Sequence, residues 1–278
     1  MLYLCATPIG NLDDMTFRVI NILKEVDLIA AEDTRNSIKL LNHFDIHTPM
    51  TAYHEFNKVE KAKELVKYML EGKSVAVITD AGTPGISDPG EELARQARAA
   101  GIQVTSVPGA CACITALTMS GLPTRRFCFE AFLPTDKKEC RRVLDELKDE
   151  TRTIVMYEAP HRLLKTLQLL LDELGDRQMT VTKELTKKHE SSYEGKISEH
   201  IAFFTANEPK GEYVLVIAGR SFEELEQEAR EQWEDVSLEE HVQMYLDKGM
   251  DKKEAMKAVA QDRGISKRDV YNALLEKG

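Results

Sequence analysis

Stretches with the hydrophobic spacing of helices alternate with short apolar runs through the first 120 residues. Apolar residues at helical spacing predict helices over residues 16–26, 37–44, 58–71, 91–100 and 111–120. Apolar runs predict strands over residues 2–7, 27–31, 50–53, 74–79 and 103–107. The run at 74–79 has an unbroken apolar centre, which is typical of a strand that is covered on both faces. This alternation predicts a parallel sheet with helices on both of its faces.

A second α/β pattern follows the turn residues Gly121-Leu122-Pro123, where we expect a domain boundary. Strands are predicted over residues 127–132, 153–157, 179–185, 189–193 and 212–218, and helices over residues 137–150, 162–174 and 198–206. Several connections are as short as hairpins, which favours a mixed sheet.

Beyond Gly219 the pattern is helical only. Residues 222–235 form an acidic helix or linker, and residues 237–249, 252–263 and 266–276 resemble three short helices. The predicted fold class is therefore α/β, with two α/β domains over residues 1–121 and 122–220. A small all-helical extension over residues 221–278 completes the predicted organisation.

Charge and composition narrow the classes of function. The chain has 42% hydrophobic and 30% charged residues, which is ordinary for a soluble globular protein. Its net charge of −10 would disfavour nucleic-acid binding, but residues 223–240 hold nine acidic residues against one basic residue. The acidity is thus partly local, and a nucleic-acid partner stays open.

Cysteine use and the N-terminus indicate a cytoplasmic location. The five cysteines are odd in number and form no C-x-x-C pair, so we expect neither a disulfide framework nor a zinc site. The N-terminus lacks the pattern of a secretion signal, and the apolar runs are too short to cross a bilayer.

Three loops that directly follow predicted strands are rich in glycine and proline. They cover residues 7–13, 80–90 and 108–112. Ligands of parallel α/β sheets bind at the carboxyl ends of strands, and glycine lets the backbone approach a ligand closely. The alternative is three tight turns without a ligand. Because all three loops fall at strand ends of one predicted sheet, we expect a ligand site there.

The loops do not have the residues of the common nucleotide sites. None matches G-x-x-x-x-G-K-[ST] or G-x-G-x-x-G, and none carries a lysine for a polyphosphate. S-adenosylmethionine is a ligand that fits loops of this kind, because it has no triphosphate and its sulfonium prefers carbonyl oxygens to lysines. The loops narrow the choice of ligand without fixing it.

An ordered set of motifs resembles the tetrapyrrole-methylase superfamily and, within it, the family of small-subunit ribosomal RNA methyltransferases of type I. The motifs are TPIGNL at residues 7–12, AEDTR at 31–35, TDAGTP at 79–84, DPG at 88–90, PG at 108–109, FEAFLP at 129–134, YEAPHR at 157–162, KELTK at 183–187 and GEYVL at 211–215. The resemblance covers residues 1–219 in order, and the helical tail resembles that family's C-terminal extension.

The resemblance implies a function and a set of partners. That family uses S-adenosylmethionine to methylate the 2′-oxygen of one cytidine in the decoding region of 16S ribosomal RNA. The resemblance also implies a homodimer that needs no metal. Its expected substrate is 16S rRNA or the assembled small subunit, and neither a membrane nor DNA is an expected partner. The donor is expected in the cleft between the two α/β domains.

The same resemblance supplies expected donor contacts and catalytic candidates. The donor contacts are Pro8, Asp80, Ala81, Gly82, Thr83, Ile86, Ser87, Asp88, Pro108, Gly109, Ala110, Ala112, Phe132, Tyr157, Leu185 and Glu212. The catalytic candidates among the ionisable residues of the motifs are Asp33, Arg35 and Glu184, with Arg35 suited to an RNA phosphate. The alternative for Asp33 and Arg35 is an ion pair in a surface turn.

Two other functions stay open from the sequence. A methylase of tetrapyrrole precursors would share the fold, and it should have a wide apolar cleft rather than a basic surface. The last two predicted helices, with Lys267 and Arg268 at the start of the second, resemble a helix-turn-helix and thus a DNA-binding regulator. An RNA-docking module or a dimer-stabilising appendage are the other interpretations of this tail.

Overall fold

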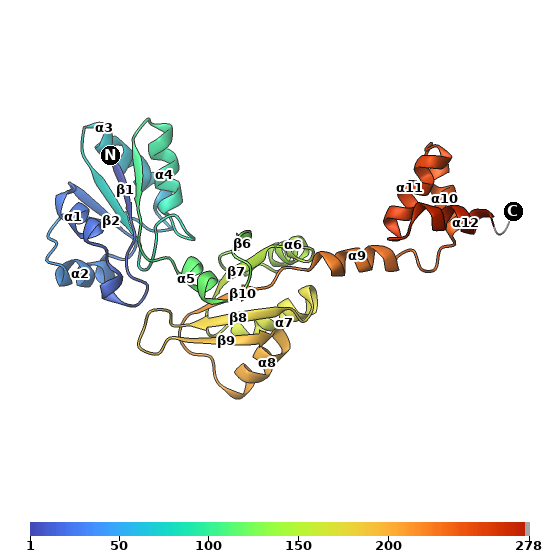
Figure 1. Cartoon of the computed structure of the whole chain (residues 1–278). Coiled ribbons are helices and arrows are strands. Elements are labelled where there is room, and N and C mark those ends of the chain that lie inside the picture. Colours follow the sequence, from blue (N-terminus) through green and yellow to red (C-terminus); the bar gives the residue numbers. More distant parts are fainter. Residues whose placement is uncertain (276–278) are drawn as a thin grey trace. The chain divides into compact units, whose positions relative to one another are not determined.

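The first half of the chain folds around a five-stranded sheet in which every strand is parallel to its neighbours (Figure 1). The computed structural model describes residues 1–275. The strands are β1 (Leu2–Cys5), β2 (Leu28–Ala31), β3 (Met50–Ala52), β4 (Val75–Ile78) and β5 (Val104–Val107), in the order β3-β2-β4-β1-β5. Strand β4 is central and buried along its whole length, which confirms the prediction from its apolar centre.

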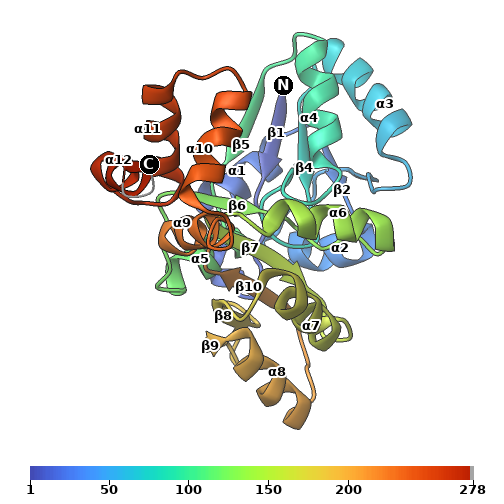
Figure 2. The same cartoon turned by 90° about the vertical axis from the view of Figure 1, so that its right-hand side faces the viewer.

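Helices cover both faces of this first sheet. Helices α1 (Phe17–Glu25) and α2 (Thr34–His43) pack on one face through residues such as Leu23 and Leu41. Helices α3 (Lys58–Leu70) and α4 (Gly90–Ala99) pack on the other through Leu65 and Leu93, and they lie side by side in both views (Figures 1 and 2). Successive strand residues point to opposite faces, so the all-apolar strands supply both cores.

A second five-stranded sheet is mixed, as the short connections predict. Its strands are β6 (Phe127–Phe129), β7 (Thr153–Glu158), β8 (Gln178–Lys183), β9 (Ser191–Lys196) and β10 (Tyr213–Ile217), in the order β6-β7-β10-β8-β9. Only β6 and β7 pair in parallel, and the other neighbours are antiparallel. Helices α6 (Lys137–Leu147), α7 (Leu163–Leu174) and α8 (Ile197–Ala206) cover one face.

Helix α5 (Ala112–Met119) covers the other face of this second sheet. Its buried residues Cys113, Ala116 and Leu117 pack against Val155 and Val216 of the central strands. The sequence places this helix in the first predicted domain, yet it packs on the second sheet. Residues 1–147 and 152–218 accordingly form one compact unit. The boundary at residue 121 remains a proposal.

In the second sheet, two predicted strands run at least two residues too far, and left-handed backbone explains both errors. The strand expected over residues 127–132 ends at Phe129, because Ala131 has φ +48°. The strand expected over residues 179–185 ends at Lys183, because Glu184 has φ +52° and Thr186 has φ +65°. A residue in this region cannot continue a β-ladder. The strand expected at 189–193 lies at Ser191–Lys196, and a short 3₁₀ helix, η1 (Leu12–Asp14), was not predicted.

Among the described residues, the helical tail over residues 219–275 and the segment 148–151 form a second compact unit. It contains α9 (Phe222–Glu231), α10 (Leu238–Asp247), α11 (Lys252–Asp262) and α12 (Lys267–Leu275). The last three helices share a core that includes Val242, Met256 and Val270, which confirms three short helices. The predicted end of the last helix, Glu276, lies outside the described residues. In the part of the chain that the structure describes, no helix is long and apolar enough to span a membrane.

Candidate functional site

Three loops meet at the carboxyl end of the first sheet. Because β1 lies between β4 and β5, the loops that follow these strands are neighbours. The N–H of Thr7 donates to the Gly82 carbonyl oxygen at 2.9 Å, and the N–H of Gly82 donates to the Thr7 carbonyl oxygen at 3.1 Å. The Thr83 hydroxyl donates to the Ala110 carbonyl oxygen at 2.9 Å. The convergence of the three loops that the strand pattern predicts is therefore present.

Glycine is required where these loops approach most closely. A Cβ added at Gly109 would lie 2.6 Å from the Cβ of Ala6, so the loop after β5 could not pass β1 as it does. Gly82 has φ +85°, a conformation that other residues rarely adopt. The small residues in these loops thus set how near their backbones lie.

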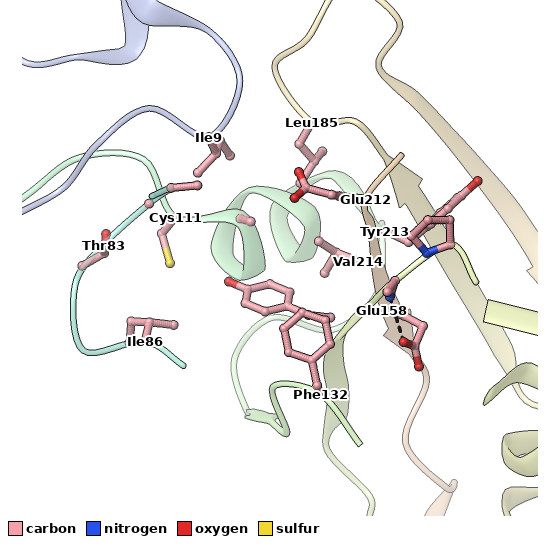
Figure 3. A pocket seen from close by; sticks show the side chains of 16 residues that line it. Ile9, Thr83, Ile86, Cys111, Phe132, Glu158, Leu185, Glu212, Tyr213 and Val214 are labelled. Carbon is pink, nitrogen blue, oxygen red and sulfur yellow. Dashed lines mark hydrogen bonds between the residues drawn. The ribbon is translucent and has the colours of Figure 1, made fainter. Parts of the chain in front are cut away.

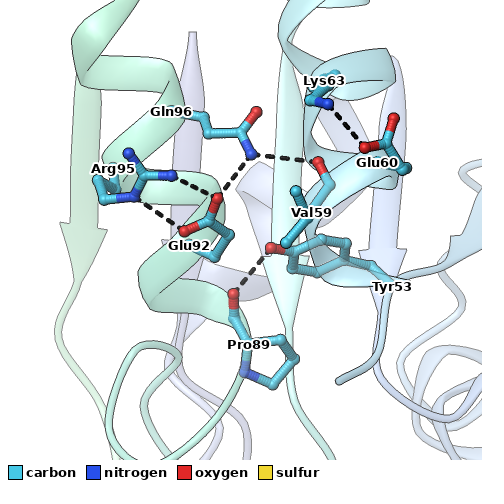
Figure 4. Close-up of polar contacts among 8 residues, drawn as sticks. All are labelled: Tyr53, Val59, Glu60, Lys63, Pro89, Glu92, Arg95 and Gln96. Carbon is cyan, nitrogen blue, oxygen red and sulfur yellow. Dashed lines mark hydrogen bonds and ion pairs between the residues drawn. The ribbon is translucent and has the colours of Figure 1, made fainter. Parts of the chain in front are cut away.

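Hydrogen bonds within the loop over residues 80–90, and one from outside it, fix the conformation of this loop. The carboxylate of Asp88 accepts from the N–H groups of Gly85 at 2.8 Å, Ile86 at 3.2 Å and Gly90 at 2.7 Å. The hydroxyl of buried Tyr53 donates to the Pro89 carbonyl oxygen at 2.8 Å (Figure 4). These bonds fix the loop, and they occupy the Asp88 carboxylate.

A pocket of about 360 Å³ opens between these loops and the second sheet (Figure 3). Ile9, Thr83 and Cys111 lie on one side of it, and Phe132 and Leu185 lie across from them. The sixteen lining residues are Ile9, Ala81, Gly82, Thr83, Ile86, Cys111, Ala112, Phe132, Tyr157, Glu158, Ala159, Pro160, Leu185, Glu212, Tyr213 and Val214. Its volume is in the range of pockets that hold small molecules.

Aromatic side chains form the wall that the second sheet supplies. The ring of Tyr157 lies 5.0 Å from Phe129 and 5.6 Å from Phe132, in edge-on contacts between ring centroids. The Tyr157 hydroxyl accepts from the N–H of Cys113 at 3.2 Å, which joins this wall to the start of α5. Phe132 is 47% exposed, so a ligand in the pocket would cover it.

The pocket has no cationic side chain among the described residues that line it, and its two carboxylates are engaged. Buried Glu158 accepts from Thr166 Oγ1 at 2.5 Å and Ala159 N–H at 2.7 Å, and lies 3.5 Å from Arg162 Nε. Glu212 is exposed and pairs with Lys187 Nζ at 3.2 Å. Such a pocket suits a ligand with apolar and cationic parts better than a polyphosphate. S-adenosylmethionine meets this description.

The structure brings nine of the expected donor contacts together in the lining. These are Ala81, Gly82, Thr83, Ile86, Ala112, Phe132, Tyr157, Leu185 and Glu212. The other seven lie in the same loops outside the lining, namely Pro8, Asp80, Ser87, Asp88, Pro108, Gly109 and Ala110. Cys111 lies in the 108–112 turn that was expected to contact the donor. Sequence reasoning missed Ile9, Glu158, Ala159, Pro160, Tyr213 and Val214, although they fall within the motifs that it used.

Asp33 and Arg35 do not line the pocket. The Asp33 carboxylate caps α2 by accepting from the Arg35 N–H at 2.8 Å, and it pairs with the Arg35 guanidinium at 2.8 Å. The side-chain hydrogen bond from Arg35 lowers the pKa of Asp33 to about 2. The Arg35 side chain is 88% exposed. The predicted alternative, an ion pair in a surface turn, is thus present, while a contact to RNA remains a proposal for Arg35.

Glu184 does not line the pocket either. Its carboxylate accepts from the Glu212 N–H at 2.9 Å and from Lys187 Nζ at 3.0 Å. It packs against Gly211, where an added Cβ would lie 2.5 Å from Glu184 Oε1. Burial acts to raise the pKa of Glu184, but the hydrogen bonds from Glu212 and Lys187 outweigh it and lower this pKa.

Glu32, which directly follows β2, has a pKa that shifts in the opposite direction to that of Glu184. Its carboxylate accepts from the Asp80 N–H at 3.3 Å, and Asn36 Nδ2 donates to the Asp80 carboxylate at 3.3 Å. Burial, together with the negative charges of Asp80 and Asp88, raises the pKa of Glu32. Of the carboxylates in the AEDTR motif, Glu32 is the one whose pKa moves toward that of a general base.

No cluster of three or more His, Cys, Asp and Glu side chains suited to a metal ion occurs within residues 1–275. The expectation that the chain uses no metal stays a prediction.

Comparisons with known proteins agree with this geometry. Residues 1–201 match the family model of tetrapyrrole (corrin/porphyrin) methylases. The chain is 49% identical, over 98% of its length and 93% of the relative, to ribosomal RNA small subunit methyltransferase I of Halalkalibacterium halodurans. It is 45% identical to the Thermotoga maritima protein of the same name, over 79% of this chain and 98% of that protein.

Among solved structures, a uroporphyrin-III-C-methyltransferase from Thermus thermophilus is similar, with a TM-score of 0.55 and 19% identity. The match covers 78% of this chain and 93% of that one. Identity this low shows a shared fold and nothing more about activity.

Proposed function

Because the chain belongs to the family of proteins named ribosomal RNA small subunit methyltransferase I, we propose that it methylates the 2′-oxygen of a cytidine in 16S ribosomal RNA with S-adenosylmethionine as the donor. The observation that carries the proposal is the pocket of about 360 Å³ at the carboxyl ends of β1, β4 and β5. A chain of this family with a donor-sized pocket at that edge is a methyltransferase.

The lining residues divide between the two ends of such a donor. Ala81, Gly82 and Thr83 present backbone close to the pocket, which suits the polar groups of an amino acid and a ribose. Tyr157 and Phe132 present aromatic surface, which suits an adenine ring or a sulfonium cation. When bound, S-adenosylmethionine would supply an electrophilic methyl group.

The residues of the chain contribute mainly by positioning. Holding two reactants in one oriented arrangement can lower a barrier by about 7–11 kcal/mol. Glu32, with its raised pKa, is the proposed acceptor of the hydroxyl proton. Asp33 and Glu184 hold Arg35 and the 184–187 turn in place, and the exposed guanidinium of Arg35 contacts an RNA phosphate.

The helical tail is proposed to dock the RNA or the small subunit, while the larger unit carries the chemistry. The Thermotoga protein has the same name although the match spans 98% of it and only 79% of this chain, which supports an accessory role for part of this chain. Arg268 at the start of α12 is exposed and available to a phosphate. A homodimer and a cytoplasmic site of action follow from the same proposal.

Transfer of a labelled methyl group tests the proposal directly. The protein is incubated with labelled S-adenosylmethionine and small subunits from a strain that lacks this activity, and the modified nucleoside is mapped. We expect one 2′-O-methylcytidine in 16S rRNA. Label in a tetrapyrrole intermediate, with none in the rRNA, would reject the proposal in favour of the small-molecule methylase.

The role of Arg35 has its own test. We expect Arg35→Ala to keep the affinity for the donor and to slow methylation about ten-fold or more, because a phosphate contact is lost. The matched control is Arg98→Ala, which removes another exposed arginine of the same sheet domain, at the C-terminal end of α4. An unchanged rate and RNA affinity in Arg35→Ala would remove Arg35 from the site.

A further inference from the structure

Two cysteines lie in contact where α5 begins at the edge of the pocket. Cys111 is the N-cap residue of α5 and lines the pocket, with its sulfur on the pocket side (Figure 3). Cys113 is buried at 4% exposure behind it. Their two Sγ atoms are 3.4 Å apart. Neither thiol has a part in the methyl transfer proposed above.

The two thiols are in different chemical states. A hydrogen bond from the Cys113 thiol, with further help from the N–H groups of Ile114 and Cys113, lowers the pKa of Cys111 to about 6. That hydrogen bond, burial and the charge of Cys111 raise the pKa of Cys113. Cys111 is therefore the nucleophile of the pair, and Cys113 keeps its proton.

We propose that Cys111 and Cys113 form a thiol-modification site in the pocket wall, where a hydroperoxide oxidises the pair to a disulfide. The Cys111 thiolate attacks the outer oxygen of the hydroperoxide. The O–O bond breaks, an S–O bond forms, and the remaining alkoxide or hydroxide takes a proton, which leaves a sulfenic acid at Cys111. The Cys113 sulfur then attacks the Cys111 sulfur. The S–S bond forms, the S–O bond breaks, and the Cys113 proton leaves with the hydroxyl as water.

The local geometry permits this closure. The Sγ atoms must approach from 3.4 Å to about 2.05 Å. Cys111 is the N-cap residue with an extended φ of −148°, and α5 holds it through its carbonyl oxygen, which accepts from the Thr115 N–H and hydroxyl at 3.0 Å each, so its side chain is the part that must move. Once Cys111 is a sulfenic acid, its negative charge no longer raises the pKa of Cys113. The first step therefore prepares the second.

The disulfide should weaken donor binding, and this part of the inference rests on the proposed function. The turn before Cys111 holds the Thr83 loop through the Ala110 carbonyl, and the Cys113 N–H holds the Tyr157 hydroxyl. Drawing the Cys111 sulfur toward Cys113 takes it out of the pocket wall. It also displaces the hydrogen bonds from Thr83 to Ala110 and from Cys113 to Tyr157. Both walls of the pocket shift as a result.

Peptide mass spectrometry tests the modification site without any donor. The full chain is treated with hydrogen peroxide, blocked with an alkylating agent and digested. We expect the peptide with Cys111 and Cys113 to lose two hydrogen atoms and to regain them with dithiothreitol. In Cys113→Ser, which cannot form the disulfide but keeps a hydroxyl that can donate to the Cys111 sulfur, a sulfenic acid at Cys111 should be trapped by dimedone. Cys128→Ala, which removes another half-buried cysteine outside the pocket lining, should oxidise like the wild type. A disulfide at another pair, or a lasting sulfenic acid in the wild type, overturns the proposal.

Calorimetry with S-adenosylmethionine tests the link to the pocket. We expect the oxidised wild type to bind about ten-fold more weakly than the reduced protein, and dithiothreitol to restore the affinity. Unchanged affinity after complete disulfide formation would overturn this link while the modification site stands. Absence of binding by the reduced protein would instead overturn the proposed function, and the mass spectrum would still decide the thiol pair.

Discussion

The two sheets of the larger unit build the walls of one pocket in opposite ways. The first sheet contributes short loops with small residues, such as Ala81, Gly82 and Ala112, which are held together by backbone hydrogen bonds. The second sheet contributes large side chains, among them Phe132 and Tyr157. One wall therefore works by how closely its backbone can approach, and the other by the surface that its side chains present.

The two sheets also differ in which residues take left-handed backbone at the ends of their strands. The loops of the first sheet use glycine at two left-handed positions, Gly82 and Gly85, and another residue at only one, Ser87 with φ +67°. The second sheet places Ala131, Glu184 and Thr186 in left-handed backbone, which costs on the order of 1 kcal/mol for each such residue. Hydrogen bonds that join Glu184 to Glu212 and Lys187 offset part of this cost. Adding a side chain should therefore damage the first wall, and removing a side chain should damage the second.

Adding a side chain to the first wall should have the largest effect on the affinity for the donor. Gly109→Ala places a Cβ 2.6 Å from Ala6, so the loops after β1 and β5 must separate. We expect the affinity for S-adenosylmethionine, measured by calorimetry, to fall about ten-fold or more, which corresponds to about 1.4 kcal/mol.

The control for this change is Gly101→Ala, at the opposite end of β5. A Cβ there has no neighbour within 4 Å, although φ is +75°. The control should lose some stability, because of the strained backbone, and should keep its donor affinity. Equal donor affinities in the two variants would show that the close approach of the loops does not shape the pocket.

Removing a side chain from the second wall should have a smaller effect. Phe132→Ala removes a ring that packs against Tyr157 at 5.6 Å and is 47% exposed. We expect a loss of about 1 kcal/mol in donor binding, or about five-fold in affinity, with little change in the free energy of unfolding. Phe17→Ala removes a ring that is 87% exposed and outside the lining, and should leave the affinity unchanged. A wild-type affinity in Phe132→Ala would take the aromatic wall out of donor recognition.

The sequence predicts the first wall better than the second, for physical reasons. Alternating strands and helices predict a parallel sheet, and a parallel sheet puts the carboxyl ends of its strands at one edge, so the three loops are expected at that edge. They meet because β1 lies between β4 and β5, a strand order that the pattern does not determine. The second wall depends on where strands stop, and the left-handed residues that stop them are Ala131 and Glu184, which carry no local signal of glycine or asparagine.

Contacts between distant segments account for the other misses. Glycine at position 211 makes room for the Glu184 carboxylate, and no local pattern couples two residues so far apart in the chain. Likewise, the apolar face of residues 111–120 predicts a helix but not the sheet that it covers. Asp33 is a catalytic candidate by residue type alone, and only the structure shows that its carboxylate caps the N-terminus of α2.

The last comparison concerns the electrostatics of two carboxylates that lie outside the pocket lining, Glu32 at the edge of the first sheet and Glu184 at the edge of the second. Burial raises the pKa of Glu32, so its contribution to the free energy of unfolding is full below pH 4.5 and is lost as pH rises through the folded value. The pKa of Glu184 is lowered, because hydrogen bonds from Glu212 and Lys187 outweigh burial. Its contribution is present above pH 4.5 and is lost as pH falls through the folded value.

Replacing each carboxylate by an amide should therefore change the pH profile of stability in opposite senses. Relative to the wild type, Glu32→Gln should gain stability as pH rises toward neutrality. Glu184→Gln should be less stable by about 1 kcal/mol at neutral pH, because it loses a hydrogen bond to a charged group, and the difference should shrink in acid. Denaturant unfolding followed by circular dichroism across this pH range measures both. Parallel profiles for the two variants would mean that the carboxylates at the two sheet edges are in the same electrostatic state, and Glu32 would then lose its distinction as the proton acceptor.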